Sequence, residues 1–128
     1  MKSNYKVAVA MLAGVALGAL AVQSLHAQAK PPLYSVAEID VTNLDAYLKE
    51  YVPLAQAAIK AGGGRVLAAG QNITPIEGTP PKSRVTILQW ESVEQYNAYR
   101  KSAAFADARK IGDKYAKFRS FAIEGVPQ

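Results

Sequence analysis

The sequence predicts an α+β domain of the ferredoxin-like class, with a split β-α-β pattern, a four- to five-stranded antiparallel sheet and helices on one face of that sheet. The first observation is the order of the elements, which runs strand, helix, strand with a hairpin, strand, helix, strand over residues 34–124. The second is the length, because 128 residues suit a single domain. An open sheet face usually packs against a partner. We therefore expect a homodimer through apposed sheet faces.

The first predicted strand covers residues 34–41, where side chains alternate between two faces. One of these faces is small and apolar and suits packing against helices; it consists of Ser35, Ala37, Ile39 and Val41. Thr42 or Asn43 then caps a helix. Pro53 interrupts this helix, because an internal proline removes a hydrogen bond and clashes with the preceding turn. We expect a kink near residues 49–53, or two abutting helices.

The middle of the chain is rich in glycine and proline. Glycines 62–64 end the helix. Residues 65–69 form a short predicted strand, and residues 72–77 continue in extended form, with Pro75 marking an edge or a bulge. After a proline-rich loop, residues 84–91 have the composition of the strongest strand in the chain.

The last third of the chain predicts two helices and one strand. Ser92 and Gln95 have the spacing of a capping box, which opens the first of these helices. Ser102 starts the second helix, which we expect at residues 103–115. Residues 118–124 form the final predicted strand.

Residues 1–29 have the pattern of an export signal. Lys2 and Lys6 precede an apolar run at residues 7–22. The tripeptide Ala27-Gln28-Ala29 fits the small-x-small pattern of a cleavage site.

Cleavage is expected after Ala29 or after Ala27, which makes residues 30–128 the ferredoxin-like domain. We expect this domain to be periplasmic or secreted, with no stable membrane insertion once the signal is removed. The alternative is an uncleaved N-terminal membrane anchor. The apolar run covers 16 positions, which is short of the roughly 20 residues that a spanning helix needs.

The composition of the mature chain excludes several kinds of site. His26 is the single histidine and lies in the leader, and the sequence has no cysteine. A Cys nucleophile, a Ser-His-Asp triad, a Cys/His zinc site and haem ligation by His or Cys are therefore excluded. We expect no metal and no cofactor. Without Lys2 and Lys6 the net charge falls from +5 to +3, so nucleic acid is not an expected partner.

The first candidate catalytic residue is Glu38, which shares a strand face with Asp40 and Tyr34. A carboxylate whose pKa is raised by burial can act as a general base, and Tyr34 can place a hydroxyl beside it. The alternative is that Glu38 faces solvent or bridges to an arginine across the sheet.

The candidate ligand-binding residues are Arg65, Glu77, Arg84 and Trp90. The planar forks of the two arginines suit an anionic ligand. Trp90 can line an aromatic pocket, in which Tyr34 and Tyr51 can place a hydroxyl. The alternative is structural: Glu77 pairs with an arginine across the hairpin, and Trp90 belongs to the core.

Residues 34–126 resemble the domain of unknown function 1330 family, of the dimeric α+β barrel superfamily. The resemblance is carried by several short motifs together: Gly63-Gly64-Arg65, Glu77-Gly78, the turn Pro80-Pro81-x-x-Arg84, Trp90 and the closing Glu124-Gly125. It implies a ferredoxin-like dimer and no established activity. Relatives in the superfamily include cofactor-free monooxygenases, lactone isomerases and haem-binding enzymes.

We therefore expect an exported dimer that binds a small aromatic or anionic molecule. The alternatives are a cofactor-independent monooxygenase or isomerase, which needs only positioning and one base, and a purely structural or interaction dimer. A cavity that holds Glu38, or a tyrosine hydroxyl beside an arginine, favours binding or catalysis over the structural role.

Overall fold

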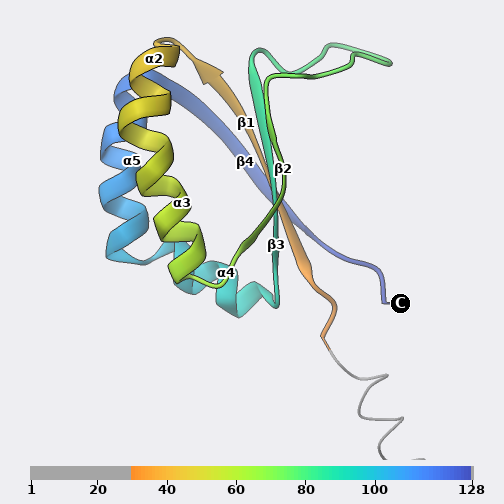
Figure 1. Cartoon of the computed structure of the whole chain (residues 1–128). Helices are drawn as coiled ribbons and strands as arrows, with labels where there is room; N and C mark the ends of the chain where they lie inside the picture. Colours follow the sequence, from red (N-terminus) through yellow and green to blue (C-terminus); the bar gives the residue numbers. More distant parts are fainter. Residues whose placement is uncertain (1–29, 128) are drawn as a thin grey trace, which may run out of the picture. The chain divides into compact units, whose positions relative to one another are not determined.

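The computed structural model describes residues 30–127. Four strands form one antiparallel sheet in the order β2-β3-β1-β4. Their bounds are β1 Leu33–Val41, β2 Arg65–Gly70, β3 Arg84–Trp90 and β4 Ala116–Glu124. The helices all lie on one side of this sheet, and its other face carries none of the described helices (Figure 1). The predicted ferredoxin-like α+β fold is confirmed.

Five helical segments connect the strands. Between β1 and β2 lie α2 (Leu44–Ala46), the π-helix η1 (Tyr47–Tyr51) and α3 (Val52–Ala61); between β3 and β4 lie α4 (Val93–Arg100) and α5 (Ala103–Tyr115). The predicted caps start these helices, since the side chains of Asn43, Ser92 and Ser102 accept hydrogen bonds from backbone N–H groups three residues later. None of the helices in the described part of the chain is long and apolar enough to cross a membrane.

Where a kink near residues 49–53 was expected, the chain forms the wide turn of a π-helix. The Val52 N–H bonds the carbonyl of Tyr47, five residues back. Pro53 follows directly, and because it has no N–H it cannot donate the α-helical hydrogen bond to the carbonyl four residues earlier. π-turns inside helices are rare and are often found at functional sites. This turn begins and ends at a tyrosine, Tyr47 and Tyr51.

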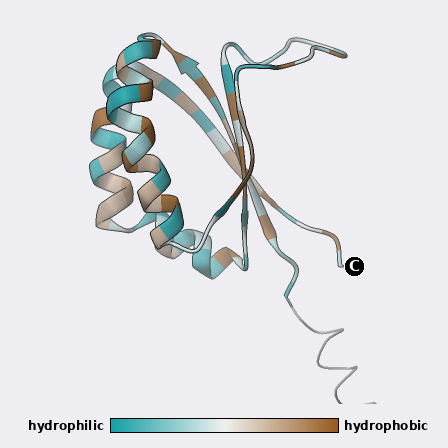
Figure 2. Cartoon of the chain, in the orientation of Figure 1, coloured by the Kyte–Doolittle hydropathy of each residue, from teal (hydrophilic) through white to brown (hydrophobic). Residues whose placement is uncertain are grey.

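The predicted extension of the hairpin over residues 72–77 is wrong, because this segment is no strand. It belongs to a loop of residues 71–83 that extends away from the sheet and the helices (Figure 1). Parts of this loop are hydrophobic, as Figure 2 shows. Ile76 is 94% exposed in this loop. Pro75, Pro80 and Pro81 have no N–H to donate to a neighbouring strand. The sheet therefore has four strands, the lower of the two expected numbers.

The predicted helix stop at glycines 62–64 is confirmed. Gly63 has φ of +84°, which lies in the left-handed region that favours glycine. Gly64 is needed for a different reason: an added Cβ would lie 2.6 Å from Cη2 of Trp90. The chain therefore passes directly against the most buried ring of the core.

The core consists of two clusters. The larger contains Leu33, Ala58, Ile59, Leu88, Trp90 and Tyr99, and the smaller contains Ile39, Tyr47 and Ala116. Leu33 and Ile39 lie six residues apart on β1, so the clusters are separated by about 20 Å along that strand. Between them β1 presents Ser35 and Ala37 to the helices.

Candidate functional site

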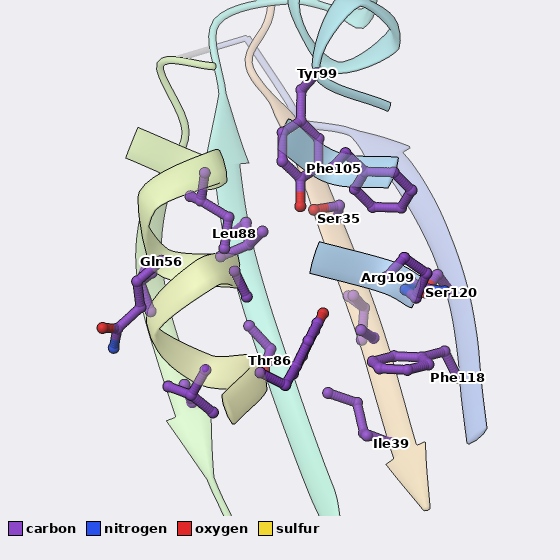
Figure 3. A pocket seen from close by; sticks show the side chains of 18 of the residues that line it. Ser35, Ile39, Gln56, Thr86, Leu88, Tyr99, Phe105, Arg109, Phe118 and Ser120 are labelled. Carbon is purple, nitrogen blue, oxygen red and sulfur yellow. The ribbon is translucent and has the colours of Figure 1, made fainter. Parts of the chain in front are cut away.

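A cavity of about 120 Å³ lies between the helix-covered face of the sheet and the helices α3 and α5. It exists because small residues occupy one row across all four strands. Ala37 pairs with Thr86 on one side and Ser120 on the other, and Thr86 pairs with Ala69. Side chains of this size do not reach the helices. The cavity thus fills the gap between the two core clusters, and Figure 3 shows several of the side chains that line it.

The first polar group in the cavity is formed by Arg84 of β3 and Tyr47 of η1. The Arg84 guanidinium lies over the Tyr47 ring, 5.5 Å from its centroid. Burial first, and then the neighbouring Tyr51, raise the pKa of the Tyr47 hydroxyl to about 12, although the charge and hydrogen bonding of Arg84 act in the opposite direction. Tyr47 is therefore a neutral hydrogen-bond donor at ordinary pH.

The second polar group joins Arg109 of α5 to Tyr51, the last residue of η1. The Arg109 guanidinium lies over the Phe118 ring, 3.8 Å from its centroid. Burial raises the pKa of Tyr51, whereas the charge of Arg109 and a hydrogen bond from it lower that pKa. The Nε atom of Arg109 is buried and has no hydrogen-bond partner. A buried donor without a partner is uncommon in proteins and requires an explanation.

Tyr99 and Phe105 form an aromatic wall at another part of the cavity, with ring centroids 5.1 Å apart. Burial raises the pKa of Tyr99 to about 12. Its hydroxyl end points toward Ser35 in Figure 3. The Arg100 guanidinium lies over the Phe105 ring, 4.6 Å from its centroid.

The charges around the cavity have one sign. Three arginines line it, Arg84, Arg100 and Arg109, and the described lining residues include no Asp, Glu or His. Neither Arg84 nor Arg109 takes part in the ion pairs found in residues 30–127. No cluster of His, Cys, Asp and Glu within that range is suited to a metal ion. The cavity therefore offers positive charge and hydrogen-bond donors within mostly apolar walls.

Two of the sequence-predicted ligand residues lie at or beside the cavity. Arg84 lines it. Trp90 lies behind it: this side chain is 1% exposed and donates from Nε1 to the Ser35 hydroxyl over 3.0 Å. Trp90 thus belongs to the core, which was the structural alternative for this residue. Its hydrogen bond orients Ser35, which lines the cavity.

The other sequence-predicted site residues lie elsewhere. Glu38 forms an ion pair with Arg119 of β4. This is the bridge across the sheet that was the alternative to a catalytic role. Tyr34 shares the face of Glu38, away from the helices, because residues two apart on a strand point the same way. Arg65 is exposed and donates to Gln89 over 2.7 Å, and Glu77 lies exposed in the loop of residues 71–83. The structure does not bring these four to the cavity.

Two functional candidates were missed from the sequence, Tyr47 and Arg109, whereas Tyr51 was expected to place a hydroxyl in an aromatic pocket and does line the cavity. Arg109 is 58 positions from Tyr51, and no local pattern connects residues so far apart. Pro53 did carry a signal, since it predicted irregular backbone where the two tyrosines lie. The row of small residues at Ser35 and Ala37 was a second signal, and it was interpreted as packing against helices.

The family assignment follows from a match over most of the domain. The family model described as "Domain of unknown function (DUF1330)" matches residues 32–126. The chain belongs to the DUF1330 family. No curated protein matches the sequence at a significant level.

Solved structures share the fold of this DUF1330 chain at low sequence identity. The RPA0582 protein of unknown function from Rhodopseudomonas palustris has 16% identity and a TM-score of 0.62, over 76% of this chain and 84% of that one. A putative antibiotic biosynthesis monooxygenase from Caulobacter crescentus has 15% identity and a TM-score of 0.59, over 77% and 92%. SnoaB, a cofactor-independent oxygenase from Streptomyces nogalater, has 11% identity and a TM-score of 0.57, over 77% and 96%. At these identities the likeness concerns the fold alone.

Proposed function

We propose that this DUF1330 protein binds a small aromatic molecule that carries negative charge, and that the ligand occupies the cavity between the helices and the sheet. The observation that carries the proposal is the charge of the cavity lining, which has three arginines and no carboxylate among the described residues. Arg100 is exposed, but Arg84 and Arg109 are half-buried, and charges withdrawn from water are normally paired in proteins. An anionic ligand supplies the partner that the lining lacks.

The size and walls of the cavity support a ligand with one ring. Its volume of about 120 Å³ is close to that of an apolar protein cavity of about 150 Å³ that accepts benzene. Phe105 and Phe118 offer aromatic faces to a ring. Arg84 and Arg109 offer planar forks, which suit a carboxylate.

Binding is favoured over base catalysis by the state of the tyrosines. A general base works best when its pKa lies near the working pH. The pKa values of Tyr47 and Tyr99 are about 12, so both hydroxyls keep their protons at neutral pH. No carboxylate in the described lining takes their place. The alternative of a cofactor-independent monooxygenase or isomerase is therefore supported by the fold of its neighbours and by no residue of this cavity.

The proposal includes a homodimer joined through the open sheet face, after export directed by residues 1–29. An apolar row across that face supports the dimer: Ile87, Val36 and Phe121 pair in register on β3, β1 and β4. Phe121 is 48% exposed in the single chain. Apolar surface of this kind on a sheet is usually covered by a partner. The leader lies outside the described residues.

The proposal is tested by thermal unfolding of the purified protein with benzoate, cyclohexanecarboxylate and inorganic phosphate. We expect benzoate to raise the Tm most, because only benzoate combines a flat ring with a carboxylate. At 100 times its Kd a ligand adds about 2.7 kcal/mol to the free energy of unfolding. Arg109→Gln should reduce the shift, because one of the two half-buried arginines of the cavity is lost, and Arg65→Gln, which removes the same charge outside the cavity, should preserve it. Equal shifts in these two variants would refute the assignment of the site.

A further inference from the structure

The cavity contains two arginine–tyrosine pairs, Arg84 with Tyr47 and Arg109 with Tyr51. We propose that the ligand carries two separate acceptor groups on its ring, one bound by each pair, so that the preferred ligand class is an aromatic dianion such as a benzenedicarboxylate. This inference rests on the proposed function and specifies the substrate class of the same cavity.

The two arginines of these pairs come from different elements of the fold. Arg84 comes from β3 and Arg109 from α5, and they meet tyrosines at opposite ends of the single π-turn. The Tyr47 and Tyr51 rings are 5.1 Å apart between centroids. The guanidinium of Arg84 lies over Tyr47, whereas that of Arg109 lies over Phe118. The two guanidinium groups thus reach the cavity from different elements and lie against different rings, although the charge of Arg109 also acts on Tyr47.

Each pair is arranged as a donor of hydrogen bonds. A ring that packs on the face of a guanidinium leaves the N–H groups at its edge free to bind an anion. Arginine has no acceptor, so a tyrosine that bonds to it accepts through its oxygen and keeps its own proton for a third group. The buried Nε of Arg109, which has no partner, adds a further donor.

Apart from the tyrosine oxygens, these donors meet no charged acceptor among the described lining residues. The side chains of Ser35, Thr86 and Ser120 are the polar groups of the sheet that line the cavity, and all are uncharged hydroxyls. Asp113, whose charge acts on Tyr51, does not line the cavity, so the two guanidinium groups are matched best by two anionic groups of a ligand. One carboxylate would satisfy a single pair and leave the other with its charge unmatched.

The neutral state of the tyrosines supports this arrangement. Burial raises the pKa of both Tyr47 and Tyr51, so both are protonated where carboxylates are ionised. Each arginine–tyrosine pair then carries one net positive charge. Two such pairs match the two charges of a dianion.

The test is calorimetric titration of the purified protein with benzoate and with the three benzenedicarboxylate isomers at one salt concentration. We expect at least one isomer to bind tenfold or more tightly than benzoate, because hydrogen bonds to charged groups contribute more than neutral ones. Arg84→Gln and Arg109→Gln should each lower the affinity for that isomer to the affinity that the protein has for benzoate. Arg65→Gln should keep the preference, which controls for the general attraction of a dianion to a basic protein.

Two outcomes separate this inference from the function on which it rests. Benzoate binding equal to that of all three isomers would overturn the inference and leave the proposed function standing. Absence of binding by every aromatic anion would overturn both. The variants Tyr47→Phe and Tyr51→Phe keep the packing of the rings and remove only the hydroxyls, so they test the pairs without risk to folding. Each should lower the affinity for the preferred isomer and leave the Tm of the free protein nearly unchanged.

Discussion

Gly112 of α5 lies directly against the ring of Tyr51, where an added Cβ would be 2.7 Å from both Cδ2 and Cε2 of the tyrosine. Real Cβ atoms do not approach a ring this closely, so only glycine at this position lets α5 support Tyr51 in its place. A glycine inside a helix costs about 1 kcal/mol relative to alanine. The position of the cavity tyrosine is thus maintained at the expense of helix stability.

Gly112→Ala should therefore displace Tyr51 and weaken benzoate binding at least tenfold. The gain in helix propensity, about 1 kcal/mol, opposes the clash, so the Tm of the free protein should change less than the affinity. Calorimetric titration and thermal unfolding measure the two effects separately. Ala106→Ser, on the exposed side of α5, serves as a control for helix substitution. Unchanged affinity in Gly112→Ala would show that Tyr51 does not contact the ligand.

The free energy of unfolding should fall as the pH rises from 10 to 12. In the folded protein the pKa values of Tyr47 and Tyr99 are about 12, above the ordinary 10.0, because burial disfavours the phenolate. Below pH 10 both states keep the proton and this stabilisation is fully present; it is lost as the pH passes through the folded pKa. Urea unfolding at several pH values measures the slope.

Tyr47→Phe should reduce this alkaline slope by up to about 1.4 kcal/mol per pH unit, which is the most that one titrating group contributes. Tyr34→Phe, on the open face of the sheet, removes a hydroxyl outside the cavity and is the matched control. An equal reduction in the two variants would contradict the link between the cavity tyrosine and alkaline stability.

Gly64→Ala should destabilise the fold by about 1–3 kcal/mol, the usual cost of overpacking a core. The new Cβ would lie 2.6 Å from Cη2 and 2.8 Å from Cζ3 of Trp90, whose ring is fully buried. Chemical denaturation gives the difference in unfolding free energy. In a Trp90→Phe background those two ring atoms are absent, so the same substitution should cost less. Equal costs in both backgrounds would show that the ring is not what excludes a side chain at Gly64.

The fold followed from the sequence because its signals are local. The alternation around Ser35, the Ser92 cap and the glycines at the end of α3 each depend on residues close in sequence, and each was found where it was expected. The segment at 72–77 was assigned wrongly for the same reason, since extended residues form a strand only when a distant neighbour supplies hydrogen bonds. Pro75 marks neither a strand edge nor a bulge, because the strand predicted around it does not form.

The candidate site was harder to predict because it depends on contacts between distant elements. Arg84 was found by its residue type, whereas its partner Tyr47 lies on another element. Arg109 gives no signal on α5 that separates it from the solvated lysines beside it. The cavity itself arises from what is missing, namely large side chains in the row that includes Ala37. Such a gap becomes visible only when the register of the strands is known.

Ala37→Leu should fill the cavity and abolish benzoate binding. Ala37 lies at the centre of the row of small residues, between Thr86 and Ser120. The added methyl groups occupy space that holds no protein atoms, so the Tm of the free protein should stay the same or rise. Ala106→Leu adds the same volume on the exposed side of α5 and should leave binding intact. Binding that survives in Ala37→Leu would place the ligand outside this cavity.

Phe121→Glu should convert the proposed dimer to monomers without loss of ligand binding. Phe121 pairs with Val36 at the centre of the open sheet face, where an apposed interface would bury the new carboxylate, and the neighbouring Arg119 is already paired with Glu38. The dimer dissociation constant should rise at least 100-fold, measured by analytical ultracentrifugation. Leu48→Glu, at a position 43% exposed on the helical side, carries the same change and should remain dimeric. Because the cavity is built from one chain, benzoate should still bind the Phe121→Glu monomer. A wild-type protein that sediments as a monomer, or a variant that stays dimeric, would exclude the open face as the interface.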